Sequence, residues 1–285
     1  MIAGMASPPL TDLHLHSTAS DGVLSPAELM RHVAEQGLAH VALTDHDTLA
    51  GCAEAAEAAA GLGLRFTLGI ELSCQWQGRC LHVLGLGLNN ASHTTLKPHL
   101  QHLAERRRAR IEEMGARLER KARIPAKALV EALLAETPLA TRLHLAKALW
   151  QAGHVTEVQQ AFDRWLGQGK PAHVPEAWPE LELTLAALKD CQALPVLAHA
   201  HRYRLGSGSL SRLVGEFAEM GGAGLEVSVG GMARHDLDRL ATLARRHRLA
   251  ASAGSDFHDP ALPWHRPGRF AKLPDDLERI AARLP

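Results

Sequence analysis

The first ninety residues alternate between two hydrophobic patterns. Short apolar runs, which have the length of buried strands, occur at Leu10–Leu15, His40–Thr44, Arg65–Leu72 and Cys80–Leu88. Ser25-Pro26, followed by Glu28, is typical of a helix start, and this helix is expected to end near Gly37. A second helix is expected from Thr48 to about Ala60. This succession of strands and helices predicts a parallel sheet or barrel with helices outside.

The pattern changes near Ala91, after which only helical signals occur as far as about Trp165. A densely charged run is followed by shorter amphipathic segments, and these occupy Leu103–Ile124, Ala126–Glu136, Thr141–Gly153 and Val155–Trp165. We interpret the region as an all-helical insertion. The Gly- and Pro-rich stretch Gly167–Pro179 is expected to be the return loop.

The strand and helix alternation then resumes. Strands are expected at Leu194–Ala198, Gly224–Val229 and Ala250–Ala253, and helices at Leu183–Gln192, Leu210–Met220 and His235–Arg248. Pro274-Asp275-Asp276 predicts the start of a final helix. The domain prediction is therefore residues 1–95 and 181–285 as two parts of one α/β barrel, with the helical insertion at 96–180 between them.

Composition narrows the function classes. The chain has 285 residues, is 46% hydrophobic and balances 31 basic against 31 acidic residues, which argues against non-specific binding of long nucleic acid but not against a small anionic substrate. No apolar run is long enough to span a membrane, and the N-terminus lacks the pattern of a secretory signal. We expect a cytoplasmic protein without an obligate protein partner.

The four cysteines, Cys52, Cys74, Cys80 and Cys191, form no CxxC pair. Cys74 and Cys80 have a spacing that allows them to face each other across a hairpin, but we expect reduced thiols.

Histidines and carboxylates gather where the predicted strands end. His14 and His16 alternate with Leu13 and Leu15, so on a strand both imidazoles point to one side. Asp21 follows the same strand, and further candidates lie at or after later strands: Asp45, His46, Asp47, Glu71, His82, His199, His201, Asp256 and His258. In parallel α/β barrels the carboxyl ends of the strands meet at one mouth, so we expect these side chains to converge there.

Each motif alone has a structural explanation. His14 and His16 fit a polar strand face, His82 a core histidine, and His199 a surface position. Glu71 is harder to explain in this way, because a carboxylate in an apolar strand is costly to bury without a partner or a metal. Together the motifs predict a site for Mn, Fe or Zn, because mixed imidazole and carboxylate ligands suit these metals.

The motifs His14-Leu-His16, Thr44-Asp45-His46, His199 and Asp256-Phe-His258 resemble those of the PHP (polymerase and histidinol phosphatase) superfamily, which is related to the amidohydrolases. The resemblance covers roughly residues 10–90 and 185–275 and implies a distorted (β/α)7 barrel holding two or three divalent metals, with Mn²⁺ expected first and Fe²⁺ or Zn²⁺ as alternatives. By the family pattern one metal would be held by His14, His16, Glu71 and Asp256; Asp21, His46 and His258 would complete other sites; His82 and His199 would lie on the third, and Glu71 would bridge.

The insertion is similar to one branch of this superfamily. Thr141-Arg142-Leu-His144 and Gly169-Lys170-Pro-Ala-His-Val-Pro resemble nucleoside 3′,5′-bisphosphate phosphatases and related 5′-to-3′ RNA exonucleases, in which a helical insertion caps the metal site. Ala200 stands where Pro is common in that group, which leaves the geometry of the His199 loop open.

The resemblance implies a metal-dependent phosphomonoesterase. A metal-bound hydroxide would remove the 3′-phosphate of a small nucleotide such as adenosine 3′,5′-bisphosphate, giving AMP. Arg142, Lys170 and Arg202 are the candidate substrate-binding residues, since phosphate charge needs fixed cations. Asp45 and His201 are candidate proton donors, with Asp47 as a further alternative.

Two other functions stay open. The first is a 5′-to-3′ exoribonuclease acting on short 5′-phosphorylated RNA. The arginine-rich run from Glu105 to Arg123 would then attract the RNA by its charge. The alternative interpretation of this run is a solvated helix with internal ion pairs. The five scattered tryptophans offer at most one or two base contacts. The second is a non-catalytic metal-binding module, although every expected ligand position is filled. Histidinol phosphatase activity is disfavoured by the cap motifs.

Overall fold

The computed structural model describes residues 10–175 and 177–285. The N-terminal nine residues, on which the prediction of no secretory signal rests, lie outside the described residues. The chain divides into two compact units, Met1–Leu96 with Glu180–Pro285 and Lys97–Pro179. No helix in the described ranges is both long and apolar enough to cross a membrane.

The first unit is built on seven strands that follow one another in chain order around the sheet. The strands are β1 (Thr11–Asp12), β2 (His40–Leu43), β3 (Arg65–Trp76), β4 (Arg79–Leu86), β5 (Leu194–Leu197), β6 (Gly224–Val229) and β7 (Ala250–Gly254). The sheet curls until its ends meet. The Leu13 amide donates to the Ala253 carbonyl at 3.2 Å, and the Asp256 amide donates to the His14 carbonyl at 3.0 Å. The expected distorted seven-stranded barrel with surrounding helices is confirmed.

One strand departs from the expected parallel arrangement. β4 is antiparallel to both β3 and β5, whereas the other neighbouring strands are parallel. The reason is local: Gln77 and Gly78 form a two-residue loop with φ values of 51° and 72°, which is the geometry of a tight hairpin turn. Within this hairpin Cys74 pairs with Leu81 rather than with Cys80, and all four cysteines are free.

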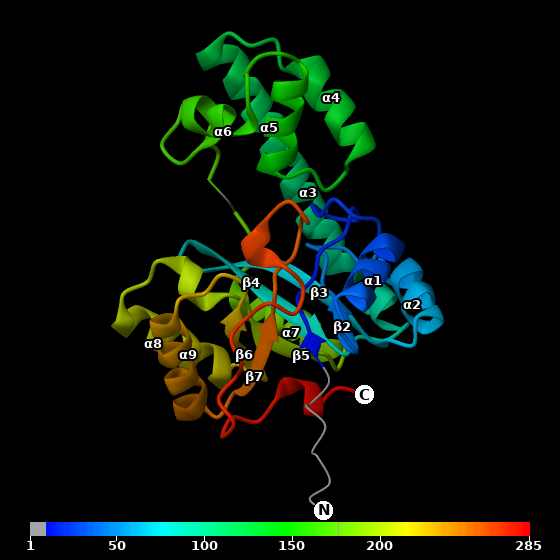
Figure 1. Ribbon diagram of the computed structural model, residues 1–285. Coiled ribbons are helices and arrows are strands. Elements are labelled where there is room, and N and C mark those ends of the chain that lie inside the picture. Colours follow the sequence, from blue (N-terminus) through cyan, green and yellow to red (C-terminus); the bar gives the residue numbers. More distant parts are fainter. Residues whose placement is uncertain (1–9, 176) are drawn as a thin grey trace, which may run out of the picture. The chain divides into compact units, whose positions relative to one another are not determined.

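Among the described residues, five α-helices lie wholly within the barrel unit (Figure 1), namely α1 (Pro26–Glu35), α2 (Cys52–Gly61), α7 (Leu181–Asp190), α8 (Ser207–Glu219) and α9 (Arg234–His247). The first begins with the predicted cap, in which the Ser25 hydroxyl accepts from the Glu28 amide and the Glu28 carboxylate accepts from the Ser25 amide. Leu15 is fully buried in a cluster with apolar side chains of α1 and α2, such as Met30 and Ala55.

The prediction of a final helix that starts at Pro274 is wrong. Only a short 3₁₀ turn at Ile280–Ala282 forms in this region. The Ala251 amide donates to the Glu278 carbonyl at 2.7 Å, and Arg279 pairs with Ala251 as an isolated bridge. Backbone pairing with β7 therefore keeps these residues extended, and it overrides the local signal for a helix start.

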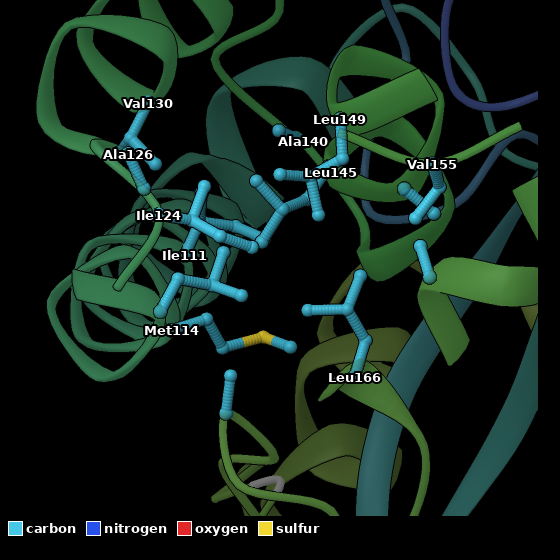
Figure 2. Packing of buried hydrophobic residues seen from close by; sticks show 14 of the residues in the cluster. Ile111, Met114, Ile124, Ala126, Val130, Ala140, Leu145, Leu149, Val155 and Leu166 are labelled. Atoms are coloured by element: carbon cyan, nitrogen blue, oxygen red, sulfur yellow. The ribbon is translucent and has the colours of Figure 1, made fainter. Parts of the chain in front are cut away.

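The second unit is helical, as expected. It contains the main part of α3 (Ser92–Arg117), then a π-helical turn (Leu118–Ala122), α4 (Lys127–Glu136), α5 (Arg142–Gln151), α6 (Val158–Ala161) and a second π-helical turn (Phe162–Leu166). Its core packs Ile111 and Met114 of α3 against Leu145 and Leu149 of α5 and against Leu166 (Figure 2). The unit thus has a hydrophobic core of its own.

The arginine-rich face of α3 holds the return segment of this unit. Arg106 donates to the Ala177 carbonyl at 2.7 Å, Arg110 donates to the Val174 carbonyl at 3.1 Å, and Arg117 bonds the carbonyl of His173. Arg107 stacks on the Trp178 ring at 5.0 Å and is 7% exposed. Ion pairs within α3, such as that between Arg108 and Glu112, involve other members of the run. The run therefore has a structural role beyond the solvated helix expected from the sequence.

Candidate metal centre

Glu71 lies at the middle of the candidate site. It is fully buried on β3, where its neighbours in sequence are apolar. Its Oε2 atom lies 3.1 Å from His14 Nε2, 3.2 Å from His16 Nε2 and 3.2 Å from His46 Nδ1. β1, β2 and β3 follow one another as parallel strands of the sheet, and the segments after β1 and β2 bring these three imidazoles to one carboxylate oxygen.

The second oxygen of Glu71 faces two more histidines. Oε1 lies 3.1 Å from His82 Nδ1 on β4 and 2.9 Å from His199 Nε2, which follows β5. The His82 and His199 rings meet edge to face at 5.3 Å between centroids. Glu71 therefore joins side chains from both sides of β3, as a bridging ligand would.

Three groups of donor atoms have the spacing needed to hold a cation, since the ligand atoms within each group all lie within 4.8 Å of one another. The groups are His14, His16, Glu71 and Asp256; His16, Asp21, His46 and His258; and His46, Glu71 and His82. The structure brings together eight of the nine residues expected as ligands in these groups, and the ninth, His199, contacts Glu71. Their assignment as ligands stays a prediction.

Several buried nitrogens fit this role. Both ring nitrogens of His16, and the Nδ1 atoms of His46 and His82, are buried and form no hydrogen bond with any described residue. A buried polar atom without a partner is costly, and a set of imidazole and carboxylate donors suits a first-row divalent cation. The residues present thus fit the divalent metal binding that the sequence predicts.

The electrostatics favour ionised carboxylates. Burial alone would raise the pKa of Glu71, but the charges of His46 and His14 hold it well below its ordinary value. Burial acts in the same way on Asp256, and the charge of His14 and the contact with His16 outweigh it, so the pKa of this carboxyl is also lowered. Both groups therefore present negative oxygens to a cation at neutral pH.

Glu226 is a functional candidate that the sequence analysis missed. It is fully buried on β6; its Oε1 lies 2.9 Å from His14 Nδ1, and its Oε2 accepts a 2.7 Å hydrogen bond from the His199 amide. A carboxylate on the far nitrogen of a ligating histidine fixes its tautomer and orientation. The signal that identified Glu71, a carboxylate in an apolar strand, is also present in Gly-Leu-Glu226-Val.

The backbone is unusual at the edge of the site. His199 has φ 28°, Asp256 φ 55° and Asp47 φ 54°, values in the left-handed region that residues with side chains seldom adopt. The hydrogen bond from the His199 amide to Glu226 and that from the Ser73 amide to Asp47 hold two of these positions. Such conformations cluster at functional sites, where the surrounding structure enforces them.

Asp45 has a clear structural role. Its Oδ1 accepts from the Ser17 amide at 2.7 Å and from the Ser20 hydroxyl at 2.6 Å, and its Oδ2 accepts from the Ser17 hydroxyl at 2.6 Å. These bonds fix the loop that leads from His16 to Asp21. A further role for Asp45 as proton donor stays a prediction.

Arg202 and His201 lie on a 3₁₀ turn directly after His199. The Arg202 guanidinium bonds Asp256, and its side chain is 34% exposed. Burial, together with the charge of Arg202, lowers the pKa of His201 to about 4, so this imidazole is neutral at pH 7. Arg202 is thus a fixed cation beside a candidate metal ligand.

Arg142 and Lys170 belong to the helical unit. Arg142 is the first residue of α5, whose N-cap Thr141 accepts from the His144 amide in a reciprocal cap with the His144 ring. Lys170 is exposed in the return segment. Their role in substrate binding, and the capping role of the unit, stay predictions.

Comparison with known proteins decides the family. The family profile described as PHP domain matches residues 12–174. The chain belongs to the PHP domain family. Its relatives include the 5′-3′ exoribonuclease Rnm of Escherichia coli, 37% identical over 271 residues that cover 94% of this chain and 92% of that protein. The 3′,5′-nucleoside bisphosphate phosphatase of Chromobacterium violaceum is 36% identical over 263 residues, which cover 92% of each chain.

Solved structures agree with this assignment. An amidohydrolase from Chromobacterium violaceum with bound sulfate matches this PHP chain with a TM-score of 0.86 and 35% identity, covering 96% of this chain and 95% of the other. A protein from Bifidobacterium adolescentis, assigned to the metal-dependent phosphoesterases, matches with a TM-score of 0.78 and 28% identity, covering 97% and 95%. These matches and the clustered donors support a metal-dependent phosphoesterase.

Proposed function

We propose that this PHP chain hydrolyses the 3′-phosphate of nucleoside 3′,5′-bisphosphates, giving a nucleoside 5′-monophosphate and phosphate. The observation that carries the proposal is the set of three donor groups, two of which share Glu71, together with the Arg202 cation paired to Asp256. The Chromobacterium violaceum relative, a 3′,5′-nucleoside bisphosphate phosphatase, supports the choice of substrate.

The residues of the site have two proposed roles, metal binding and phosphate binding. Divalent cations, when bound, neutralise phosphate oxygens and lower the pKa of a coordinated water. Glu71, Asp256 and the surrounding histidines would hold these ions at fixed separations, with Mn²⁺ expected first. Arg202 has donors left beyond its bond to Asp256 and is partly exposed, so it would bind a non-bridging phosphate oxygen of the substrate.

A second phosphate distinguishes the proposed substrate from simple esters. It needs further cations, and we propose that Arg142 and Lys170 supply them. We also propose that the protein acts in the cytoplasm, on small nucleotides of this kind.

Exoribonuclease activity on short 5′-phosphorylated RNA is the second candidate. It is favoured by the Escherichia coli relative, which is about as similar to this chain as the phosphatase is. The arginines of α3 add less support than the sequence indicated, because Arg106, Arg110 and Arg117 bond the carbonyls of Ala177, Val174 and His173.

The experiment compares adenosine 3′,5′-bisphosphate with a short 5′-phosphorylated RNA, each at equal concentration with Mn²⁺. Faster release of phosphate from the bisphosphate, with AMP as the other product, supports the proposal. Rapid shortening of the RNA from its 5′ end, with slow bisphosphate hydrolysis, would replace it by the exoribonuclease. Arg202→Ala should lower kcat/KM on the bisphosphate by at least about tenfold, because it removes a charged phosphate contact, while Arg212→Ala on α8 serves as the control.

A further inference from the structure

The five tryptophans are scattered in the sequence, and in the structure they differ clearly in exposure to solvent. Trp76 and Trp178 are both 5% exposed, and Trp165 packs against the core of the helical unit. Trp150 and Trp264 are 48% and 58% exposed. Trp150 lies on α5 of the helical unit, whereas Trp264 lies in the barrel unit, on the chain segment that follows Asp256.

The backbone of Trp264 is anchored at the mouth of the barrel. It lies in the short 3₁₀ turn Pro263–His265, the orange-red turn near the tip of the β7 arrow in Figure 1. Gly230 follows directly after β6, and a Cβ atom built on it would lie 3.1 Å from the Trp264 carbonyl oxygen and 2.6 Å from that of Ser255. This close packing fixes the turn against the carboxyl end of β6, where barrel enzymes carry their active sites.

The next residue connects the turn to the metal centre. Burial lowers the pKa of the His265 imidazole, the charge of Asp256 raises it, and the charges of Arg202 and His258 lower it. Trp264 therefore directly precedes a residue that senses the charge of the candidate ligands Asp256 and His258, yet more than half of the Trp264 surface faces solvent. A large aromatic face is thus presented to solvent on a turn that packs at the carboxyl end of β6, next in sequence to His265.

We propose that Trp264 stacks on the nucleobase of the substrate. The inference rests on the proposed function and adds a base subsite to it. An indole face binds any base through stacking and burial of apolar surface, without reading hydrogen-bond donors or acceptors. The subsite therefore selects nucleotides over sugar phosphates without selecting among bases.

The test measures binding as well as turnover. Calorimetric titration compares AMP with ribose 5-phosphate, which carries the same phosphate and sugar but no base, on the wild-type chain and on Trp264→Ala. Loss of base stacking should weaken AMP binding about 5- to 100-fold and leave ribose 5-phosphate binding unchanged. Trp264→Phe, which keeps an aromatic face, should retain most of the AMP affinity.

Leu183→Ala is the matched control, because Leu183 is a similarly exposed apolar residue at 61% in the same unit. Equal loss of affinity for both ligands in Trp264→Ala, or no loss for either, would overturn the base subsite. So would a wild-type chain that binds AMP no better than ribose 5-phosphate.

These outcomes are separable from those of the proposed function. A wild-type chain that leaves adenosine 3′,5′-bisphosphate intact contradicts the phosphatase proposal, whereas the AMP and ribose 5-phosphate affinities still decide the role of Trp264. A Trp264→Ala chain that hydrolyses the bisphosphate with unchanged KM contradicts the subsite alone.

Discussion

Two buried carboxylates organise the candidate centre at the scale of single residues. Glu71 contacts the Nε2 atom of His14 directly. Glu226 contacts the opposite ring nitrogen, Nδ1, and also accepts a hydrogen bond from the His199 amide. Neither carboxylate is exposed at all, so each must be compensated by partners or by a metal. Glu226 acts on the centre through His14 and is a positioning residue.

Glu226→Gln should therefore weaken metal binding. The amide keeps the size of the side chain but removes the charge that orients His14, and partners of this kind are worth about 10- to 100-fold in metal affinity. Metal titration followed by elemental analysis measures the change, with exposed Glu219→Gln on α8 as the control. Wild-type metal affinity in the Glu226→Gln variant would remove the positioning role.

His40 gives a pH-dependent prediction. It is buried with its Nε2 atom 2.8 Å from the Thr67 hydroxyl, and burial, followed by the charge of Arg65, lowers its pKa from 6.5 to about 4. The unfolded chain then binds a proton that the folded chain does not, so stability present above pH 6.5 is lost as the pH falls toward 4. Between pH 8 and pH 5, the unfolding free energy should fall by about 2 kcal/mol less in His40→Gln than in the wild type. Urea unfolding at both pH values checks this, and identical losses would contradict it.

At the scale of elements, the centre depends on how the barrel closes. His14 follows β1 and Asp256 follows β7, and the Asp256 amide donates to the His14 carbonyl across that junction. Gly254 ends β7 at the same place. A Cβ atom on it would lie 2.3 Å from the His14 Cβ and 3.1 Å from Glu226 Oε1. The approach of the two strands thus requires a residue without a side chain.

Gly254→Ala should disturb stability and site together. The added methyl group must displace His14, which we expect to cost about 1–3 kcal/mol of unfolding free energy and to lower metal affinity. Gly61→Ala at the end of α2 is the control, because nothing lies within 4 Å of the added methyl group there. Denaturant unfolding compares the two variants, and equal stability would show that the junction tolerates a side chain.

The same scale shows what a sequence can predict. Strand ends carrying His14, His46 and Asp256 are visible as local patterns, and their convergence follows from barrel geometry. The helix expected at Pro274 does not form, since residues 278–279 pair with β7, a partner distant in sequence. Local capping signals cannot report such pairing.

At the scale of the whole molecule, the barrel unit carries a complete candidate centre, and the helical unit carries its own core. The arginine run of α3 illustrates a limit of sequence analysis. Its charge is evident, but three of its arginines bond the carbonyls of His173, Val174 and Ala177, and backbone acceptors have no sequence signature. The criterion that identified Glu71, a carboxylate in an apolar strand, also applies to Glu226. No His or Asp motif lies next to Glu226 in the sequence, and it was therefore missed.

The most direct test of the account is the number of divalent ions bound per chain in the wild type and in Glu71→Gln, measured by elemental analysis after equilibration with Mn²⁺. Glu71 contributes to two of the three donor groups and contacts His199 as well. We predict two or three ions in the wild type and a loss of at least one in the variant, with phosphate ester hydrolysis lowered at least about 100-fold and the circular dichroism spectrum unchanged. Equal ion counts and equal hydrolysis in the two chains would contradict the central claim.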